Sequence, residues 1–437
     1  MPGKGNLGRI GRPFRMMVVG NAVSSYGSFL NLVALNLFAL ATTGSALSVG
    51  IFLFIRIGSS LLSGFVAGRL VGRFNRKFLM LGGDLSQAVA LLAFTLLPDE
   101  GRAVLLYGLA AVMGSCTTLS SVALRSSVPE IVGQERRVQA NGWLVTGRSF
   151  AMTLGFASAG LIVAWAGYDA AFVVDAITFL VSATILALLP LKELAPSPVA
   201  ARRAVEARQP GRPRLTMLSR YGPTVIFLVG IRAMDNFGSA SHQVGLPVYA
   251  TQIAPDGAAA FVGRFWSAWA IGCLLAHQLL SRLPGIADKA MGRTGAGGGE
   301  RAFAVGTCLM SGLFILAFTG LPTLALLAVA VGAGLTDGFT QIAYDSRLQV
   351  VPDEMRGRLF GQATMAETTA LGAGTVLCAA LLDHLPAVAV VAMAHGSAIT
   401  VSLLFLALLV TIPALAANGQ RPGHAPRNPA PSRAPSP

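Results

Sequence analysis

Charged residues are scarce in this chain of 437 residues. Asp, Glu, Lys and Arg make up 12% of it, whereas 54% of the residues are hydrophobic and the mean hydropathy is +0.65. In soluble domains the charged share is about a quarter. The composition therefore excludes an ordinary soluble domain and indicates a polytopic membrane protein. Acidic residues are the scarcest charges, 19 against 33 basic ones, which gives a net charge of +14.

The sequence also lacks patterns typical of metal sites, redox pairs and enzymes. Its four cysteines stand singly in four apolar runs, without the CxxC spacing of a metal or redox pair. No HExxH or GxSxG pattern occurs, so we expect no enzyme, no metal and no cofactor. No GxxxxGK[ST] pattern occurs either, so ATP is not expected as the direct energy source.

Long apolar runs fill most of the chain. A helix needs about 20 apolar residues to cross the hydrocarbon core of a bilayer. The sequence therefore predicts an all-α integral membrane protein with twelve transmembrane helices, at residues 16–40, 47–67, 78–97, 103–124, 139–165, 168–191, 223–250, 259–281, 302–320, 322–344, 359–382 and 386–416.

The domain organisation follows from a break after the sixth run. Residues 192–221 are rich in Pro and Arg and are predicted to form a cytoplasmic linker between a bundle at 16–191 and a second at 222–416. We expect a cytoplasmic tail at 1–15 and a disordered tail at 417–437.

Basic residues lie almost entirely on one side of this threading. Four of the 33, at positions 56, 148, 232 and 264, fall inside apolar runs, and Arg102 lies in a connection on the opposite side. All others lie in the two tails and the connections on their side. Since Lys and Arg in short loops stay in the cytoplasm, we expect a multi-pass plasma-membrane protein with both termini cytoplasmic. Such scattered basic residues do not indicate a nucleic-acid partner.

The two groups of six runs share short sequence matches. Tyr26-Gly27-Ser28 in the first run corresponds to Phe237-Gly238-Ser239 in the seventh. Val128-Pro129-Glu130 after the fourth run corresponds to Val351-Pro352-Asp353 after the tenth. Parallel repeats of this kind are an arrangement that transporters use. We therefore predict two pseudo-symmetric six-helix bundles.

The connection after the second run carries a recognisable motif. The segment Gly68-Arg-Leu-Val-Gly72-Arg73-Phe-Asn-Arg76-Lys77 resembles the signature Gly-x-Leu-Ala-Asp-Arg-x-Gly-Arg-Lys of the major facilitator superfamily. It departs where Gly72 replaces the aspartate and where Asn75 replaces a glycine. The resemblance implies the major facilitator fold, with the first and seventh helices lining a central cavity. In that family the missing aspartate helps to hold the two halves together on the cytoplasmic side.

Further segments are similar to one branch of that superfamily, the transmembrane secretion effectors, which include the enterobactin exporter and macrolide efflux proteins. They are Arg125–Pro129, Gln139–Asn141, Arg148-Ser149 and Val351–Phe360. This resemblance implies export. In the fifth run, Gly155–Gly160 lacks the proline of the Gly-Pro-x-x-Gly-Gly pattern of many antiporters, but keeps its small residues.

Several charged residues fall inside the apolar runs, where a charge costs about 2.5–3.5 kcal/mol on insertion scales unless it faces a cavity or a partner. Asp84 and Arg148 lie at similar depths and are predicted to form a buried ion pair. Arg232 and Asp235 are three residues apart on the seventh helix, so they share a face and can also pair.

A carboxylate that faces the cavity near a histidine could bind and release a proton during transport. Asp235 is our first candidate for proton coupling and His242, on the same face, is the second. The alternative for Asp235 is that Arg232 merely neutralises it. Glu367 is a further candidate, because no basic residue lies at its depth on the tenth or eleventh helix, and a cationic substrate could instead be its partner.

The remaining candidates are predicted to line a broad and largely apolar substrate cavity. A polar stripe on the first helix follows the i, i+3, i+4, i+7 spacing of one face. Arg56 lies near mid-depth, where it could meet an anionic group of a substrate. The candidates are Asn21, Ser24, Ser25, Tyr26, Ser28, Asn31, Arg56, Phe237, Trp266 and Asp337.

The sequence thus predicts a monomeric secondary transporter that exports a small amphipathic molecule, a drug, siderophore or similar metabolite, by alternating access and proton antiport. Its partners are the substrate, protons and the lipid bilayer. Two alternatives stay open at this point: proton-coupled uptake by the same fold, and a non-transporting membrane scaffold or sensor.

Overall fold

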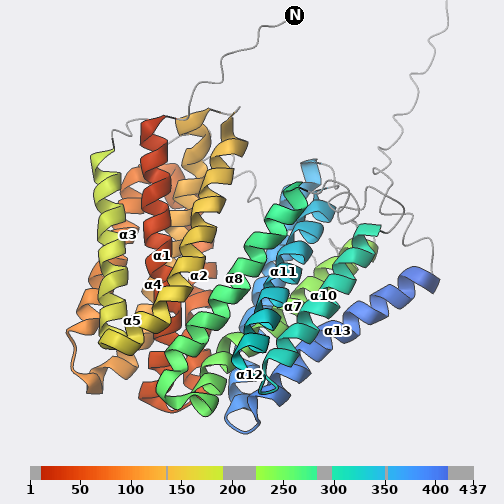
Figure 1. Cartoon of the computed structure of the whole chain (residues 1–437). Coiled ribbons are helices and arrows are strands. Elements are labelled where there is room, and N and C mark those ends of the chain that lie inside the picture. The colour runs from red at the N-terminus through yellow and green to blue at the C-terminus, as the bar shows by residue number, and fades with distance from the viewer. Residues whose placement is uncertain (1–10, 134–135, 190–222, 283–297, 350–352, 412–437) are drawn as a thin grey trace, which may run out of the picture.

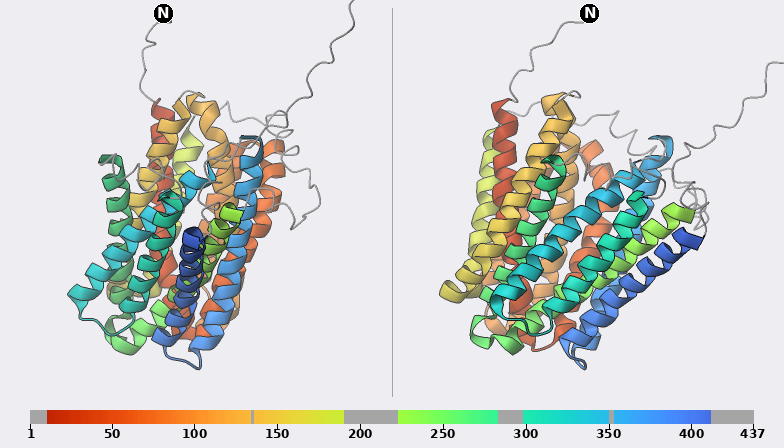
Figure 2. Two further views of the ribbon diagram at one scale, coloured as in Figure 1. Left: turned by 90° about the vertical axis from the view of Figure 1, so that its right-hand side faces the viewer. Right: turned by 45° about the vertical axis from the view of Figure 1, so that its right-hand side comes forward.

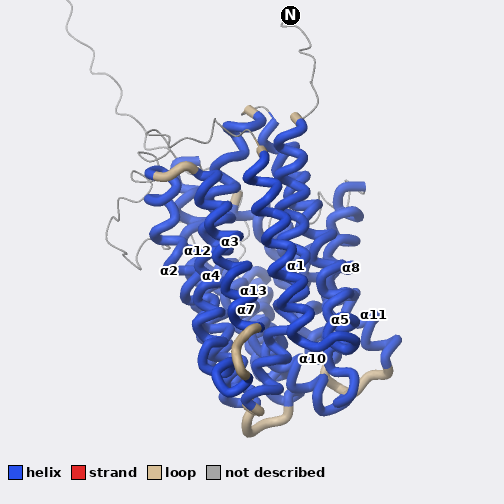
Figure 3. The backbone as a smooth tube through the Cα atoms, turned by 90° about the vertical axis from the view of Figure 1, so that its left-hand side faces the viewer, coloured by secondary structure: helices blue, strands red, loops and turns tan. Residues whose placement is uncertain are grey.

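The computed structural model describes residues 11–133, 136–189, 223–282, 298–349 and 353–411. Within these ranges all regular structure is helical, and the tube in Figure 3 shows long helices joined by short loops. The predicted linker at 192–221 and the C-terminal tail from 417 lie outside the described residues. The first helix begins at Arg12, four residues before the predicted start at Met16.

The helices run in succession along the chain. Gly167, at φ 80°, divides α5 into two helical parts. The bounds are α1 Arg12–Thr43, α2 Ala46–Arg73, α3 Arg76–Thr95, α4 Asp99–Val132, α5 Arg137–Leu188, α7 Pro223–Ile253, the short η4 Pro255–Gly257, α8 Ala258–Arg282, α10 Gly298–Ala317, α11 Thr323–Leu348, α12 Asp353–Leu382 and α13 Ala387–Thr411.

Ten of the described helices are long and apolar enough to cross a membrane. The ten count α5 once and do not include α7, whose polar residues include Arg232, Asp235 and His242. Counting both parts of α5 and adding α7 gives the twelve segments that the sequence predicts.

Local signals in the sequence set several helix ends. Gly44 adopts the left-handed conformation, at φ 65°, and its N–H donates to Leu40 O at 2.8 Å, which ends α1. The next residue, Ser45, begins α2 by accepting from Leu47 N at 3.2 Å. Asn75 begins α3 in the same way, accepting from Lys77 N at 2.9 Å. The polar residues of these short turns therefore define the chain reversals.

The helices form two groups, α1 to α5 and α7 to α13, which lie side by side (Figure 1). Within the first group α1 packs on α5 and α2 on α4, and within the second α7 packs on α12 and α8 on α11. The groups diverge toward the end at which α1 begins, as the right-hand view of Figure 2 also shows. We call this end of the molecule the open end and the opposite end the closed end.

Glycines bring the two groups together toward the closed end. On α5, a Cβ at Gly160 would lie 2.5 Å from the carbonyl oxygen of Ala259 on α8. A Cβ at Gly263 of α8 would lie 2.8 Å from Phe156 O. Gly50 of α2 meets Ala379 of α12 in the same way. Small residues let backbones approach in a membrane, where helix association depends on close packing.

A polar contact also crosses between the groups at the closed end. Asp383, which follows α12, accepts from the backbone N–H of Ala46 at 2.9 Å and from Ser45 Oγ at 3.1 Å. These donors form the N-terminus of α2, where free N–H groups and the helix dipole favour a carboxylate. Asp383 of the second group thus caps a helix of the first.

The glycine contacts predict a difference between two alanine substitutions. Gly160→Ala should lower the stability of the purified protein by about 1–3 kcal/mol, because the added methyl group has no room against α8. Gly108→Ala on α4, where a Cβ meets nothing within 4 Å, is the matched control and should stabilise by up to about 1 kcal/mol. Thermal unfolding in detergent measures both. Equal shifts for the two variants would contradict the packing.

The cap on α2 predicts an effect on accessibility. Asp383→Ala should loosen the contact between the helix groups at the closed end. The reporter is a cysteine introduced at Ser28, in the cavity, in a protein without the native cysteines. It should react several-fold faster with a membrane-impermeant maleimide applied from the closed end. Asp256→Ala, at an exposed aspartate of η4 at the same end, is the control. The cap has no role in closure if both variants react at the wild-type rate.

Candidate functional site

A large cavity lies between the two groups of helices. Its volume is about 1230 Å³, and its wall comes from α1 to α5 on one side and from α7 and α12 on the other. The lining residues extend from the open end, for example Met17 at the start of α1 and Gly64 and Phe65 near the end of α2, to Leu32 and Leu53 deep between the groups. The contacts at the closed end lie below its floor.

The polar stripe of α1 divides between the cavity and the interior. Asn21, Ser24, Ser25 and Ser28, four of its predicted lining residues, lie on the cavity wall. The other two α1 candidates do not line it, because both bind α5. The hydroxyl groups of Tyr26 and Ser158 form a hydrogen bond at 2.9 Å, and Asn31 donates to Asp175 Oδ2 at 2.7 Å.

The aromatic candidates are placed differently from the expectation. Tyr26, Phe237 and Trp266 were predicted to give the cavity an apolar, aromatic wall, but none of them lines it. Four phenylalanines, Phe29, Phe65, Phe179 and Phe360, supply aromatic surface instead, beside aliphatic side chains and those of serine, threonine, glutamine and asparagine. Trp266 lines a smaller cavity of about 200 Å³ that also touches Phe29 and Gln243, which line the large one as well. This smaller cavity lies between the groups, beyond the floor.

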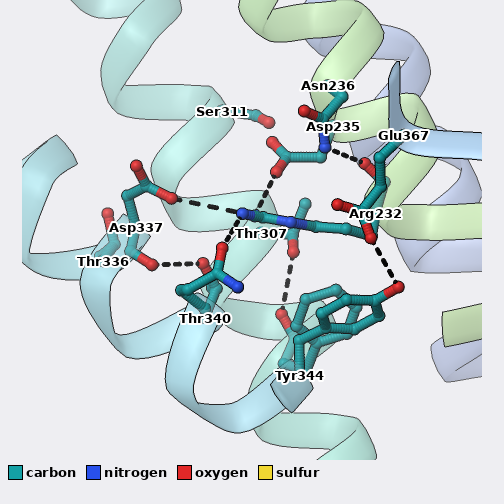
Figure 4. Close-up of polar contacts among 12 residues, drawn as sticks. Arg232, Asp235, Asn236, Thr307, Ser311, Thr336, Asp337, Thr340, Tyr344 and Glu367 are labelled. Carbon is teal, nitrogen blue, oxygen red and sulfur yellow. Dashed lines mark hydrogen bonds and ion pairs between the residues drawn. The ribbon is translucent and has the colours of Figure 1, made fainter. Parts of the chain in front are cut away.

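Asp235 belongs to a buried cluster of charges on α7, α11 and α12 (Figure 4). Arg232 Nη1 lies 2.7 Å from Asp235 Oδ2, as the spacing of three residues predicts, and 3.8 Å from Asp337 Oδ1. The same guanidinium donates to Gln341. Glu367 accepts from the Tyr344 hydroxyl at 2.9 Å, and its charge also acts on Arg232.

The charges in this cluster do not balance. Asp235, Asp337 and Glu367 surround a single guanidinium, and one oxygen of Asp235, Oδ1, is buried without a hydrogen-bond partner. Buried carboxylates need a partner, a cation or a proton. Asp337, a predicted cavity residue, lies in this cluster and not on the cavity wall. Glu367 lies on α12 beside Thr368, which does line the cavity.

His242 lies apart from this cluster, in a buried pair of histidines. Its Nδ1 lies 3.0 Å from Nε2 of His395 on α13, whose Nδ1 lies 3.1 Å from Ser311 Oγ. The His242 ring stacks on Phe314 with centroids 3.9 Å apart. His395 is not among the residues predicted from the sequence, since a lone histidine in an apolar run has no local pattern that indicates a partner.

The predicted pair of Asp84 and Arg148 is not formed in this structure. No salt bridge joins these two side chains, both of which the structure describes, although both line the large cavity. Asp84 instead has the Ser182 hydroxyl beside it, and the Arg148 guanidinium lies 5.2 Å from the centroid of the Phe29 ring. Equal depths do not fix the direction in which each helix points its side chains. Arg56 also lies on the wall, as predicted.

The motif after α2 acts within the first group of helices. Arg76 is fully buried, forms a salt bridge with Glu130 and donates to Ser126 O at 3.2 Å, which ties α3 to α4. Lys77 Nζ donates to Ala187 O and Leu189 O at 2.9 and 2.8 Å, at the end of α5. Gly68 lies on α2, and Arg73 is exposed beside Phe74.

Comparison with protein families agrees with this architecture. The family model described as the Major Facilitator Superfamily matches residues 17–372, which is well over half of the chain. The chain belongs to the major facilitator superfamily. The predicted fold, two six-helix bundles of an all-α membrane protein, is thereby confirmed, and the family is one of transporters.

Solved structures of several superfamily transporters share the fold at low sequence identity. A bacterial homologue of the iron transporter ferroportin in the inward-facing state is 15% identical, with a TM-score of 0.67 over 94% of this chain and 99% of that one. A peptide transporter in complex with sulfate is also 15% identical, with a TM-score of 0.67 over 96% and 97%. The nucleoside transporter NupG is 13% identical, with a TM-score of 0.65 over 91% and 100%. No curated protein sequence matches the chain.

Arg232 and Asp235 are in contact, whereas Arg148 and Asp84 are not, and this difference predicts different energetic coupling in the two pairs. In a double-mutant cycle for thermal unfolding, Arg232→Gln and Asp235→Asn should couple by more than about 1 kcal/mol, because they are in contact. Arg148→Gln and Asp84→Asn should add to within about 0.5 kcal/mol, because no contact joins them. Strong coupling in the second cycle would show that the predicted Asp84–Arg148 pair is populated after all.

Proposed function

We propose that this protein is a secondary transporter that exports a small amphipathic molecule by alternating access, coupled to proton antiport. The observation that carries the proposal is the combination of a cavity between two helix groups with a separate cluster of excess buried carboxyl groups. The cavity supplies a binding place for a solute, and the cluster supplies groups that can carry protons. The partners are the solute, protons and the bilayer, and the transporter works as a monomer.

The distribution of basic residues indicates which side of the membrane the cavity opens to. Described basic residues at helix ends, such as Arg12 of α1, Arg73 of α2 and Arg282 of α8, lie at the open end, and the sequence predicts that most of the others lie on the same side. We therefore assign the open end to the cytoplasm of a plasma-membrane protein with both termini inside. In this conformation the cavity takes up solute from the cytoplasm, which fits export. The segments that resemble transmembrane secretion effectors, Arg125–Pro129 and Arg148-Ser149 among them, support the same direction.

Asp235 is the proposed proton carrier because its contacts can change with its charge. When it is ionised, it holds Arg232 at 2.7 Å, and when it is protonated, Arg232 is free to shift toward Asp337, which lies 3.8 Å away. Such an exchange of partners would move α7 against α11, and small shifts at a packed interface bias the two states of a transporter. Glu367 connects the cluster to the cavity through α12.

His242 remains the second proposed carrier. Its buried contact with His395 at 3.0 Å would let a proton pass between two rings within the second group of helices. Ser311 is the next hydroxyl along this path, 3.1 Å from His395. His242, His395 and Ser311 come from α7, α13 and α10, so a shift of these helices against one another would change both contacts.

Asp235→Asn should abolish proton-coupled transport while the protein is still made and inserted normally, because the amide keeps the shape but cannot carry the proton. The measurement is substrate-driven proton movement in proteoliposomes, over a broad panel of compounds. Asp256→Asn, at an exposed aspartate of η4 in the second group of helices and outside the cluster, is the control and should keep the coupling. Proton movement at the wild-type rate in Asp235→Asn would remove Asp235 from the mechanism.

The same vesicles separate the alternatives. Export predicts that substrate moves from the open end outward against its gradient when a proton gradient is imposed. Uptake by the same fold predicts accumulation in the opposite direction. A scaffold or sensor predicts no flux of any compound and no proton movement, with or without Asp235.

A further inference from the structure

The charges on the wall of the large cavity are distributed unequally. All three charged side chains that line it, Arg56, Asp84 and Arg148, come from the first group of helices. The second group contributes neutral side chains there, among them Gln243, Gln362, Thr364 and Thr368. Its own carboxyl groups lie behind the wall around Arg232. The cavity therefore has more positive than negative charge.

The two arginines on the wall have no acidic partner. In the ranges that the structure describes, no salt bridge is made by Arg56 or Arg148, in contrast to Arg76, Arg102, Arg232 and Arg347, each of which binds a carboxylate. Arg148 is exposed to the cavity and lies 5.2 Å from the Phe29 ring. An unpaired cation at such a depth is costly unless it faces water or a ligand.

The acidic residues near these arginines are already occupied elsewhere. Asp175 acts on Arg56 electrostatically, but its carboxylate accepts hydrogen bonds from Asn31 and from Thr178, at 2.7 and 3.3 Å. Asp84 has Ser182 as its neighbour. Neither carboxylate lies within 4 Å of an arginine nitrogen. The guanidinium donors of Arg56 and Arg148 are therefore available to a bound molecule.

The arginines lie at different levels of the cavity. Arg148 is 11 residues from the start of α5, about 16 Å from the open end, and Arg56 is 17 residues from the end of α2, about 26 Å from it. The wall around Arg56 carries the Ser60 and Thr118 hydroxyls, and Leu53 and Leu32 supply apolar surface at the floor. A molecule bound there meets one cation near the entrance and a second near the floor.

We propose, on the basis of the transport function argued above, that the solute is an organic anion. Its acidic group, a carboxylate, sulfonate or phosphate, lies between the levels of Arg56 and Arg148 and is attracted by both guanidinium groups, and its apolar body contacts the aliphatic side chains of the wall. Guanidinium groups bind such acids through paired, charge-assisted hydrogen bonds. The division of charge separates two tasks: the first helix group selects the anion, and the second holds the protons.

Binding of a matched pair of probes tests the proposal. Pyrene-1-sulfonate and pyrene-1-sulfonamide share one apolar body and differ in charge. We expect the full-length protein, in phosphatidylcholine nanodiscs with empty discs as background, to bind the sulfonate about tenfold more tightly than the sulfonamide. Calorimetry or equilibrium dialysis gives both affinities without requiring transport.

Arginine variants then locate the effect. Arg56→Gln and Arg148→Gln should each lower the affinity for the sulfonate about tenfold and leave that for the sulfonamide unchanged, which also shows that the variants are folded. Arg148→Lys should restore part of the preference. Arg264→Gln, on an exposed arginine of α8 outside the cavity wall, is the matched control and should change neither affinity.

The outcomes separate this proposal from the function on which it rests. If the wild type binds both probes equally, or if the variants lose affinity for both probes equally, the proposal of an anionic solute is contradicted, and the proposed transport function is unaffected. If neither probe binds, the proposal of an anionic solute is contradicted as well. The proposed transport function is contradicted only if proteoliposomes also show no proton movement with any compound.

Competitors distinguish two sources of the anion. Displacement of pyrene-1-sulfonate by dihexanoyl phosphatidylglycerol, but not by dihexanoyl phosphatidylcholine, would identify a lipid headgroup. Displacement by neither identifies a soluble organic anion. Equal displacement by both lipids would contradict selection of an acidic group.

Discussion

The cost of placing a charge in hydrocarbon governs this structure. Each ionisable side chain within the helices must find a partner, water or a proton, because the bilayer offers none of these. Arg76, Arg102 and Arg347 meet the requirement with one carboxylate each and connect neighbouring helices. Around Arg232 the requirement is not met by pairing alone, since Asp235 and Asp337 lie 2.7 and 3.8 Å from one guanidinium and Glu367 also acts on it electrostatically. A static scaffold would have little use for such an excess.

The two groups of helices divide the chemistry between them. The first group gives the cavity its arginines and most of its hydroxyl groups, and the second holds the carboxyl cluster and the pair of histidines behind the wall. Helix α12 connects the two, because Thr364 and Thr368 line the cavity while Glu367 reaches the cluster. Occupation of the cavity and protonation of the cluster can therefore influence each other through one helix.

Much of the fold could be predicted from the sequence. Run length gives the number of spans, since it follows from the thickness of the bilayer. The i, i+3, i+4, i+7 spacing of Asn21, Ser24, Ser25 and Ser28 correctly places four residues on one face of α1, and that face lines the cavity. Spacing of three residues likewise places Arg232 beside Asp235. These are properties of single helices.

Contacts between helices were harder to predict. Asp84 and Arg148 lie at similar depths, yet the rotation of each helix about its axis decides whether they meet, and a single sequence does not encode that rotation locally. For the same reason the sequence did not predict that His395 is the partner of His242 or that Asp383 caps α2. The two residues of each contact are separated by more than 150 positions in the chain. Tyr26 and Trp266 do not line the large cavity for a related reason: Tyr26 bonds to Ser158, and Trp266 lines the smaller cavity, whereas other aromatic residues, Phe29 and Phe179 among them, do line the large one.

The most direct test of the central claim is infrared spectroscopy of the purified protein at neutral pH, in H₂O and in D₂O. The account predicts a carbonyl band of a protonated carboxyl group that shifts in D₂O and that is reduced in Asp235→Asn or in Glu367→Gln. A wild-type spectrum with all carboxyl groups ionised would contradict it, because the excess charge around Arg232 would then have been compensated without a proton.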